Sequence, residues 1–179
     1  MGISSRGTPQ KNGTGHETQA AGADSLTGKF LTFRLAGEEY GIGILKVREI
    51  IGLLEITLVP RMPSFVRGVI NLRGKVIPVI DLRLKFSMPG IEDTKQTCII
   101  VVEVRQGDLA ALVGILVDTV SEVVNINDSE IDRALSFGSK VNTTFILGVA
   151  KVKGSVKILL DIDKILGLEE LSSIANSNG

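Results

Sequence analysis

The side chains that most often carry catalysis or bind metal ions are scarce in this sequence. Among its 179 residues there is one histidine, His16, and one cysteine, Cys98. His16 falls in a polar stretch, and Cys98 begins an apolar segment without a nearby base, which is typical of an inert buried thiol. A histidine-dependent triad or a histidine-rich zinc site therefore has no second member. The sequence predicts no catalytic residue, no metal site and no cofactor.

Three patterns that can bind phosphate or calcium are incomplete. The glycine pair in residues 13–15 has no strand before it and no third glycine at the required spacing for a dinucleotide loop. Residues 153–155 read Lys-Gly-Ser, which is the wrong order for a nucleotide-binding motif and is typical of a tight turn. Residues 125–136 alternate oxygen-bearing side chains, but Glu130 and Ser136 replace the glycine and the bidentate glutamate of a calcium loop. We interpret these carboxylates as solvated or capping residues.

The charges sum to zero but are unevenly distributed along the chain. Residues 61–85 hold six basic side chains and one acid, whereas residues 86–132 hold nine acids and two bases. Opposite bias in two regions suits docking between them or two different partners. Zero net charge removes the main driving force of non-specific nucleic-acid binding. The composition thus favours a protein-binding module.

The organisation of the chain follows from hydropathy. Residues 1–27 are polar and aperiodic, so we expect a disordered tail there, and residues 168–179 form a second polar tail. No stretch reaches the roughly 18 apolar residues of a membrane helix, and the N-terminus lacks the apolar region of a signal peptide. With one cysteine, which fits a reducing compartment, the sequence indicates a cytoplasmic protein with a folded core at residues 28–167.

Most of the core is predicted to be β-structure, because its segments are short, rich in Val and Ile, and separated by Gly, Asp or Pro. The expected strands are Lys29–Leu35, Glu39–Gly43, Ile56–Val59, Gly68–Leu72, Val76–Ile80, Thr97–Val104, Ala110–Val117, Val120–Ile126, Phe145–Val152 and Val156–Leu160. Short helical turns are expected at Leu45–Ile51, Pro63–Val66 and Asp161–Leu166, the last with Asp161 as N-cap and Gly167 as C-cap. Tight hairpins are expected at Asn71–Lys75 and Lys151–Ser155, where a glycine supplies positive φ.

The core contains an internal repeat. Residues 68–82 align without gaps on residues 148–162, with both glycines, the basic residue before the second glycine and an aspartate matched. Upstream, residues 40–51 resemble residues 113–124. Two units of about five strands suit two related, small five-stranded β-barrels packed together. We expect the first barrel at about residues 28–88 and the second at about 95–167, with elements that can cross over.

These motifs resemble the CheW-like chemotaxis coupling proteins. The strings Asn71-Leu-Arg-Gly74 and Val79-Ile-Asp-Leu-Arg83 are that family's hallmark. The likeness extends over about residues 29–168 and includes Val47–Ile51, Val59–Pro60, Pro63–Phe86, Gly114–Asp118, Val120–Val124 and Phe145–Gly148. The resemblance implies two five-stranded barrels and a non-enzymatic adaptor. Such adaptors link the cytoplasmic tips of methyl-accepting chemoreceptors to the histidine kinase CheA, whose regulatory domain shares the fold, and take the receptor hairpin in a groove between the barrels.

The resemblance also implies site residues. Those expected to bind the receptor are Val47, Glu49, Arg67, Gly68, Asn71, Arg73 and Ile99. Those expected to bind the kinase are Phe137, Asp132 and Arg133, although Asp132 stands where the family has a basic residue, which places that contact in question. From its position at a turn, Arg73 could reach a partner carboxylate or pair internally with Asp81 or Glu49.

Two other interpretations are open at this point. The same fold occurs within CheA and in couplers fused to a receiver domain, but only twelve residues follow Gly167, which favours a stand-alone coupler. A barrel that binds single-stranded nucleic acid would use basic grooves and stacking aromatic residues. Six Phe, one Tyr and no Trp argue against that alternative.

Overall fold

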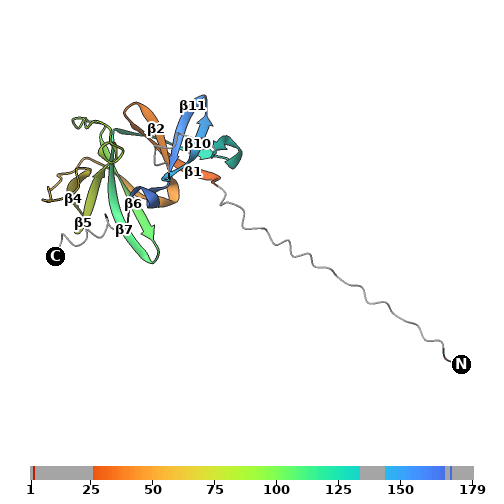
Figure 1. Cartoon of the computed structure of the whole chain (residues 1–179), viewed down its shortest axis with the longest axis horizontal. Helices are drawn as coiled ribbons and strands as arrows, with labels where there is room; N and C mark the ends of the chain where they lie inside the picture. The colour runs from red at the N-terminus through yellow and green to blue at the C-terminus, as the bar shows by residue number, and fades with distance from the viewer. Residues whose placement is uncertain (1, 3–25, 134–143, 168–169, 171–179) are drawn as a thin grey trace.

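The computed structural model describes residues 2, 26–133, 144–167 and 170, and the expected tails at residues 1–27 and 168–179 fall almost wholly outside these. The described chain is mostly β-structure, as predicted, and its strands form two sheets (Figure 1). Sheet A has the order β8 (Thr119–Ile126), β1 (Gly28–Leu35), β2 (Glu38–Gly43), β11 (Ser155–Leu160), β10 (Ile146–Val152) and β9 (Ile131–Asp132). Sheet B has the order β3 (Val47–Gly52), β6 (Cys98–Gln106), β7 (Leu109–Val117), β5 (Lys75–Asp81) and β4 (Val66–Leu72). Four helical segments of three or four residues complete the description: η1 (Ile44–Lys46), α1 (Leu82–Lys85), η2 (Asp128–Glu130) and α2 (Ile162–Ile165).

The apolar strands are buried on both faces, which explains their nearly continuous runs of Val and Ile. In β6, Ile99 and Val101 pack in a cluster confined to sheet B, whereas Ile100 and Val102 face a larger cluster shared by the two sheets. In β1, Phe30 likewise packs in a cluster confined to sheet A, and its neighbours enter the shared cluster. Each sheet therefore has its own interior and a second face buried against the other sheet.

The two repeats exchange strands. Repeat 1 comprises β1–β5 with α1, and repeat 2 comprises β6–β8, β10 and β11 with α2. Sheet A combines β1 and β2 of repeat 1 with β8, β10 and β11 of repeat 2, and sheet B combines the remaining strands. The expected boundary at residues 88–95 therefore does not separate the sheets, although crossing-over was allowed for. The physical reason is that the chain passes directly between sheets from β2 to β3 through η1 and from β7 to β8 through Asp118.

The repeat itself is confirmed in three dimensions. Asp81 N–H donates to the Phe65 carbonyl at 2.8 Å, and 80 residues later Asp161 N–H donates to the Phe145 carbonyl at 2.8 Å. Both hairpins have two central residues with positive φ, Arg73–Gly74 (52° and 83°) and Lys153–Gly154 (50° and 80°), which is the type I′ geometry that matches strand twist. The five-stranded plan recurs in each sheet, with the two-residue strand β9 added to sheet A.

Three local expectations are wrong. Leu45–Ile51 was expected to be helical, but only a short 3₁₀ turn, η1, precedes strand β3, whose residues pair with β6. Ile56–Val59 was expected to be a strand, but its one pairing with β4 is the bridge from Thr57 to Val69, whereas Pro63–Val66 forms a single hydrogen-bonded turn in line with expectation. Helix α2 is N-capped by Asp161 as expected, but its C-cap is Leu166 in an extended conformation. Tertiary strand pairing decided these segments, because short apolar runs do not distinguish helix from strand.

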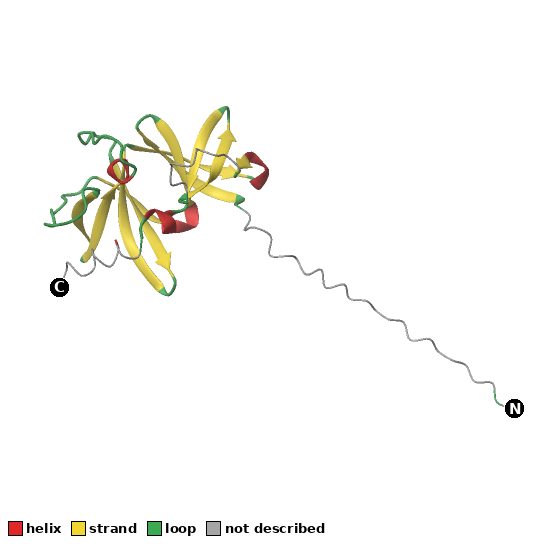
Figure 2. Ribbon diagram, in the orientation of Figure 1, coloured by secondary structure: helices red, strands yellow, loops and turns green. Residues whose placement is uncertain are grey.

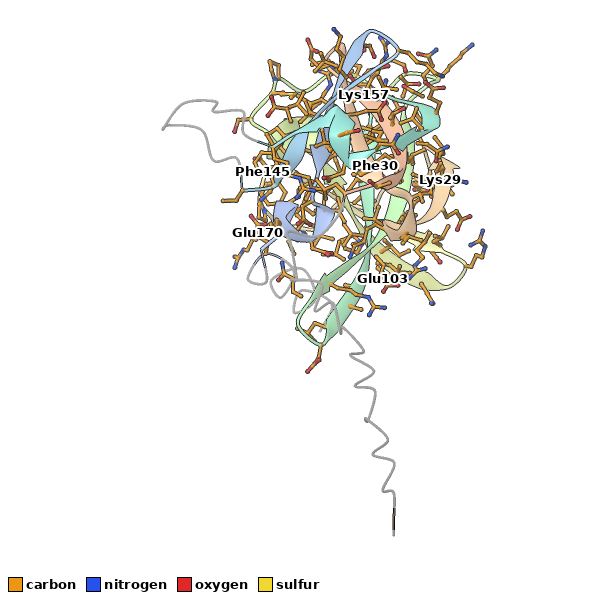
Figure 3. The ribbon with its side chains drawn as sticks, turned by 90° about the vertical axis from the view of Figure 1, so that its right-hand side faces the viewer. Lys29, Phe30, Glu103, Phe145, Lys157 and Glu170 are labelled. Carbon is orange, nitrogen blue, oxygen red and sulfur yellow. The ribbon has the colours of Figure 1, made fainter. Side chains whose placement is uncertain are left out.

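A buried ion pair lies inside sheet A. Lys157 on β11 (Figure 3) is 3% exposed, and its ammonium contacts the carboxylate of Glu39 on β2. Ser155 Oγ also donates to Glu39 Oε2 at 2.9 Å. The pKa of Glu39 is lowered, chiefly because Lys157 donates a hydrogen bond to it and Ser155 adds another, while burial acts in the opposite direction. At the corresponding positions of the repeat, sheet B has Ile77 and Leu112, which pack as apolar side chains.

Gly68 allows the connection between β3 and β4 to close against the sheet. Its φ is 139°, and a methyl group placed on it would lie 2.1 Å from the Thr57 carbonyl oxygen. Thr57 and Val69 exchange two backbone hydrogen bonds of 2.9 Å at this point. A side chain at residue 68 is therefore excluded by both backbone conformation and contact.

Replacing the buried ion pair by the apolar pair of sheet B should preserve or raise stability. We expect Glu39→Leu/Lys157→Ile to change the free energy of unfolding at pH 7 by about 0 to +4 kcal/mol, because paired charges gain little over well-packed apolar groups. Glu39→Gln alone should lower it by about 3–5 kcal/mol, since Lys157 is left buried without its counter-charge. Urea denaturation measures both values, and equal losses in the two variants would contradict this account.

The same variants predict a pH dependence. The folded pKa of Glu39 lies below its unfolded value, so the pair contributes stability above the ordinary Glu range, about pH 4.3, and loses it as the pH falls through the folded pKa. The wild-type protein should therefore lose more stability between about pH 5 and about pH 3, which bracket the ordinary Glu pKa, than Glu39→Leu/Lys157→Ile does. Parallel acid limbs in urea titrations would contradict the assignment.

Gly68→Ala should destabilise the fold by about 2–4 kcal/mol, because it adds a steric overlap to an unfavourable φ. Gly43→Ala is the matched control, since Gly43 has a negative φ and no heavy atom within 4 Å of the added methyl group. We expect this control to change stability by less than about 1 kcal/mol in urea denaturation. Normal stability of Gly68→Ala with lost partner binding would instead make Gly68 a contact residue.

Candidate functional site

One ion pair joins the two edge strands of sheet B. Glu49 lies in the middle of β3, and Arg73 occupies the turn between β4 and β5. Arg73 Nη1 donates to Glu49 Oε2 at 2.7 Å, and Nη2 contacts the other carboxylate oxygen. This is the bidentate arrangement that fits a guanidinium to a carboxylate. We call this bridged gap between β3 and β4 the seam of sheet B.

Local sequence places the arginine at the seam. Arg73 and Gly74 both adopt positive φ, and the Asn71 side chain accepts a hydrogen bond of 2.9 Å from Gly74 N–H. Asparagine at the start of such a turn stabilises it through this bond. Of the two internal partners expected for Arg73, the structure selects Glu49, and Asp81 pairs with Arg67 instead.

Arg73 is the more exposed member of this ion pair. Hydrogen bonding by Arg73 lowers the pKa of Glu49, and the carboxylate raises the pKa of Arg73, so both groups stay ionised at neutral pH. The Arg73 side chain is 73% exposed, whereas that of Glu49 is 28% exposed. A guanidinium has five N–H donors, of which these bonds use two. Arg73 can therefore hold Glu49 and still donate to an acceptor on a partner.

Exposed apolar side chains come from the elements that border the seam. They lie on β3, on the connection from β3 to β4 and on β5, and they are Ile50, Leu53, Leu54, Leu58 and Val76. Val76 is the strand partner of Asn71, next to the turn that carries Arg73. A surface that combines apolar side chains with a charged fork suits an amphipathic helix.

The structure brings most of the expected receptor residues to sheet B. Val47, Glu49, Arg67, Gly68, Asn71 and Arg73 come from β3, β4 and the β4–β5 turn. Ile99 is 0% exposed inside sheet B, and Gly68 is buried against Thr57. Direct contact with a partner is thus open to Arg73 and Asn71, whereas Ile99 could act only through packing.

Arg67 forms two ion pairs within the fold. Its Nη1 donates to Asp81 at 3.3 Å and its Nη2 donates to Asp93 at 3.0 Å. Asp81 is buried and also accepts from Leu84 N–H as the N-cap of α1. Arg67 therefore ties the segment between α1 and β6, which contains Asp93, to edge strand β4 and the end of β5.

The expected kinase residues lie at the other end of the molecule or outside the described chain. Asp132 ends β9 at the edge of sheet A, paired with Val149 on β10, and Arg133 contacts Asp128 of η2. Phe137 falls outside the described residues. The structure therefore brings Asp132 and Arg133 together, away from the seam of sheet B, and leaves the third residue unplaced.

An apolar groove of about 610 Å³ lies where β1, η1, β10 and α2 meet. Its lining includes Leu26, Phe30, Leu147 and the strongly exposed Leu45. Figure 2 shows short helical segments at this junction of the two sheets. None of the residues expected to bind a receptor lines the groove. Sequence reasoning missed Leu45 because it was assigned to a helical turn, where an apolar residue would be expected to face the core.

The described residues contain no group of three or more His, Cys, Asp or Glu side chains arranged to hold a metal ion. Within the same part of the chain, no helix is long and apolar enough to cross a membrane.

Comparison with known proteins identifies the family of the chain. The CheW-like domain model matches residues 29–170. The chemotaxis protein CheW of Klebsiella aerogenes is 40% identical over 148 residues, which cover 83% of this chain and 87% of that protein. CheW of Bacillus subtilis is 34% identical over 152 residues, covering 84% and 95%. The crystal structure of the scaffolding protein TtCheW from Thermoanaerobacter tengcongensis superposes with a TM-score of 0.70 at 34% identity and covers 81% of this chain and 91% of its own. The chain belongs to the CheW-like domain family.

Arg67→Met should loosen the segment that Asp93 anchors. We expect amide hydrogen exchange in residues 88–97 to accelerate by about tenfold, which corresponds to about 1.4 kcal/mol of local stability. Arg48→Met is the matched control, because Arg48 pairs with Glu103 on β6 and does not contact this segment. Unchanged exchange together with lost partner binding would make Arg67 a contact residue instead.

Proposed function

We propose that this chain is a non-enzymatic chemotaxis scaffold that couples the cytoplasmic tips of methyl-accepting chemoreceptors to the histidine kinase CheA and helps to control kinase activity. Membership of the CheW-like family supports the chemotaxis role. The observation that carries the receptor contact is the exposed Arg73–Glu49 pair at the seam of sheet B, bordered by exposed apolar side chains.

The seam offers what recognition of a helical hairpin requires. The exposed leucines would cover the apolar face of a receptor helix, and Arg73 would donate to a carboxylate or carbonyl beside that face. Glu49 holds the guanidinium in one orientation, so less side-chain entropy is lost when the partner binds. In this proposal Asn71 acts by fixing the turn, and Gly68 and Ile99 act by shaping the strands beneath it.

The kinase contact is proposed at the edge of sheet A, through Asp132, Arg133 and Phe137. Charge there departs from the family, because Asp132 replaces a basic residue. Arg133 lies next in the chain and contacts Asp128. A kinase surface that accepts this loop would need charges complementary to an acidic residue at this position. The regulatory domain of CheA, which shares the fold, is the proposed partner.

Two separate surfaces allow the chain to act by proximity alone. When receptor and kinase bind one scaffold, each is held at a high effective concentration near the other. A change at the receptor contact alters the kinase equilibrium only if the scaffold binds the two kinase states with different affinity. Control of the kinase in this proposal therefore needs no reaction on the scaffold itself.

Single-stranded nucleic acid is not favoured as the ligand. Base stacking needs exposed aromatic rings. Here Phe33, Tyr40, Phe86 and Phe145 stack on one another in the shared core, with successive centroids 6.0, 6.1 and 5.1 Å apart.

Arg73→Glu should weaken receptor association by about tenfold or more while the fold is retained, because the fork is lost and two carboxylates then face each other. Lys153→Glu is the matched control, since Lys153 occupies the same turn position in repeat 2 and lies 3.9 Å from Glu122 on β8. Co-sedimentation with receptor fragments measures the binding, with circular dichroism to verify folding. Normal sedimentation of folded Arg73→Glu would remove Arg73 from the contact.

The same assay tests the proposal as a whole. The wild-type protein should sediment with receptor fragments, and CheA should join the pellet only when the scaffold is present. Failure to bind either partner would refute the coupling function, and salt-sensitive oligonucleotide binding would revive the alternative.

A further inference from the structure

The chain crosses between sheets at two places, and an ion pair sits at each crossing. Where β7 runs into β8, Asp118 receives two hydrogen bonds from Arg83 of α1, at 2.7 Å from Nε and 2.5 Å from Nη2. Asp118 also accepts from Ala36 N–H, in the β1–β2 hairpin, at 2.9 Å. Burial alone raises the pKa of Asp118, but these hydrogen bonds outweigh it and lower the pKa, so the carboxylate is charged at neutral pH.

The second crossing has the same construction. Where β2 runs into β3, Lys46 of η1 contacts Asp163 of α2, with 2.6 Å between Nζ and Oδ2. Asp163 also accepts from Arg105 N–H, near the end of β6, at 2.8 Å. In both places a helix that follows the last strand of one repeat forms an ion pair with the crossing of the other repeat. The acid of each pair also accepts a hydrogen bond from a hairpin, Asp118 from the β1–β2 hairpin and Asp163 from the β6–β7 hairpin.

We call the ion pairs Arg83–Asp118 and Lys46–Asp163 the two clamps. The basic residue lies on the helix in the first clamp and on the crossing in the second. Arg83 and Asp163 occupy the same position in the two repeats, 80 residues apart, but one is basic and the other acidic. The crossings carry the complementary charges, Asp118 in repeat 2 and Lys46 in repeat 1. The helix of repeat 1 therefore matches the crossing of repeat 2, and the helix of repeat 2 matches the crossing of repeat 1.

Strand exchange makes this polarity consequential. Two copies of the chain could pair repeat 1 with repeat 1, or repeat 2 with repeat 2, using the same backbone geometry as the repeats use within one chain. By the 73-residue offset, Asp118 corresponds to Leu45 and Lys46 corresponds to Thr119. In the first case Arg83 would therefore approach the segment of a second copy that carries Leu45 and Lys46, and in the second case Asp163 would approach the segment that carries Asp118 and Thr119. Like charges juxtaposed at a partly shielded interface oppose association.

We propose that the inverted polarity of these two clamps makes each repeat pair with the other repeat and reject a second copy of itself. The buried Glu39–Lys157 pair adds to this selection, because pairing of like repeats would place Glu39 against Ile77 or Lys157 against Leu112. The clamps act through charge at the two points where the sheets are joined.

Charge reversal at one clamp tests the proposal in the full chain. Arg83→Asp/Asp118→Arg preserves an opposite-charge pair at that crossing but gives both repeats an acid on the helix and a base on the crossing. Lys46→Asp/Asp163→Lys does the same with the reverse arrangement. In either double variant the clamps of like repeats become compatible, while the unchanged Glu39–Lys157 pair still favours unlike repeats. The quadruple variant, which combines the two, makes like repeats incompatible again.

The measurement is refolding from urea over a range of protein concentrations, followed by size-exclusion chromatography with light scattering. We expect both double variants to yield a severalfold larger dimer fraction than the wild-type protein, and the quadruple variant to return to the wild-type fraction. The quadruple variant loses both carboxylates that accept from the hairpin N–H groups. If the effects of the substitutions were additive, it would form more dimer than either double variant, so a return to the wild-type fraction distinguishes the two accounts.

Glu122→Lys/Lys153→Glu is the control, since this ion pair lies within repeat 2 and is the same in every pairing. It should leave the dimer fraction unchanged. Equal dimer fractions in all variants, or a quadruple variant that forms more dimer than either double variant or does not fold, would overturn the proposal. Folding of the quadruple variant where both double variants fail would support it.

Discussion

Neither repeat of this protein can complete a sheet with its own strands, and this constraint governs the rest of the structure. The last three strands of each repeat are joined by the first two strands of the other, so every strand buries its apolar side chains only after both repeats have folded together. The large cluster between the sheets contains residues of β1, β5, β6, β7 and β11, which come from both repeats. The stability of each sheet therefore depends on both repeats, and no cut in the chain separates the two sheets as independent domains.

The exchange also determines where a binding surface forms. Because β3 and β4 are the two ends of the strand order in sheet B, a gap remains between them, which side chains must bridge. Arg73 and Glu49 do so in sheet B, and Lys153 and Glu122 occupy the corresponding positions in sheet A at a longer distance of 3.9 Å. The shorter, bidentate pair holds its guanidinium in place while leaving it exposed. The ion pair that bridges the gap in sheet B thus also holds Arg73 in an orientation in which it can contact a partner.

The repeats share a plan but have diverged in the polar groups placed on it. Sheet A contains the buried Lys157–Glu39 pair where sheet B has Ile77 and Leu112, and the clamps at the two crossings are reversed in charge. Duplicated backbones tolerate such changes because the hydrophobic pattern specifies the strands, while polar groups specify which surfaces meet. An adaptor needs that asymmetry, since its two halves must present different surfaces to different proteins.

Local sequence determined a large part of this protein: the β-class of the core, both type I′ hairpins, the aspartate caps, and the repeat with its glycines. Each depends on side-chain type over a few residues, such as Gly74 at positive φ or the Val and Ile runs of β6. Tertiary structure alone decided the exchange of strands, the strand β3 in place of a helix, and the choice of Glu49 over Asp81 as the partner of Arg73. These depend on residues far apart in the chain, and the repeats offer two pairings with the same local pattern. Burial of both sheet faces and the charges at the crossings select between them.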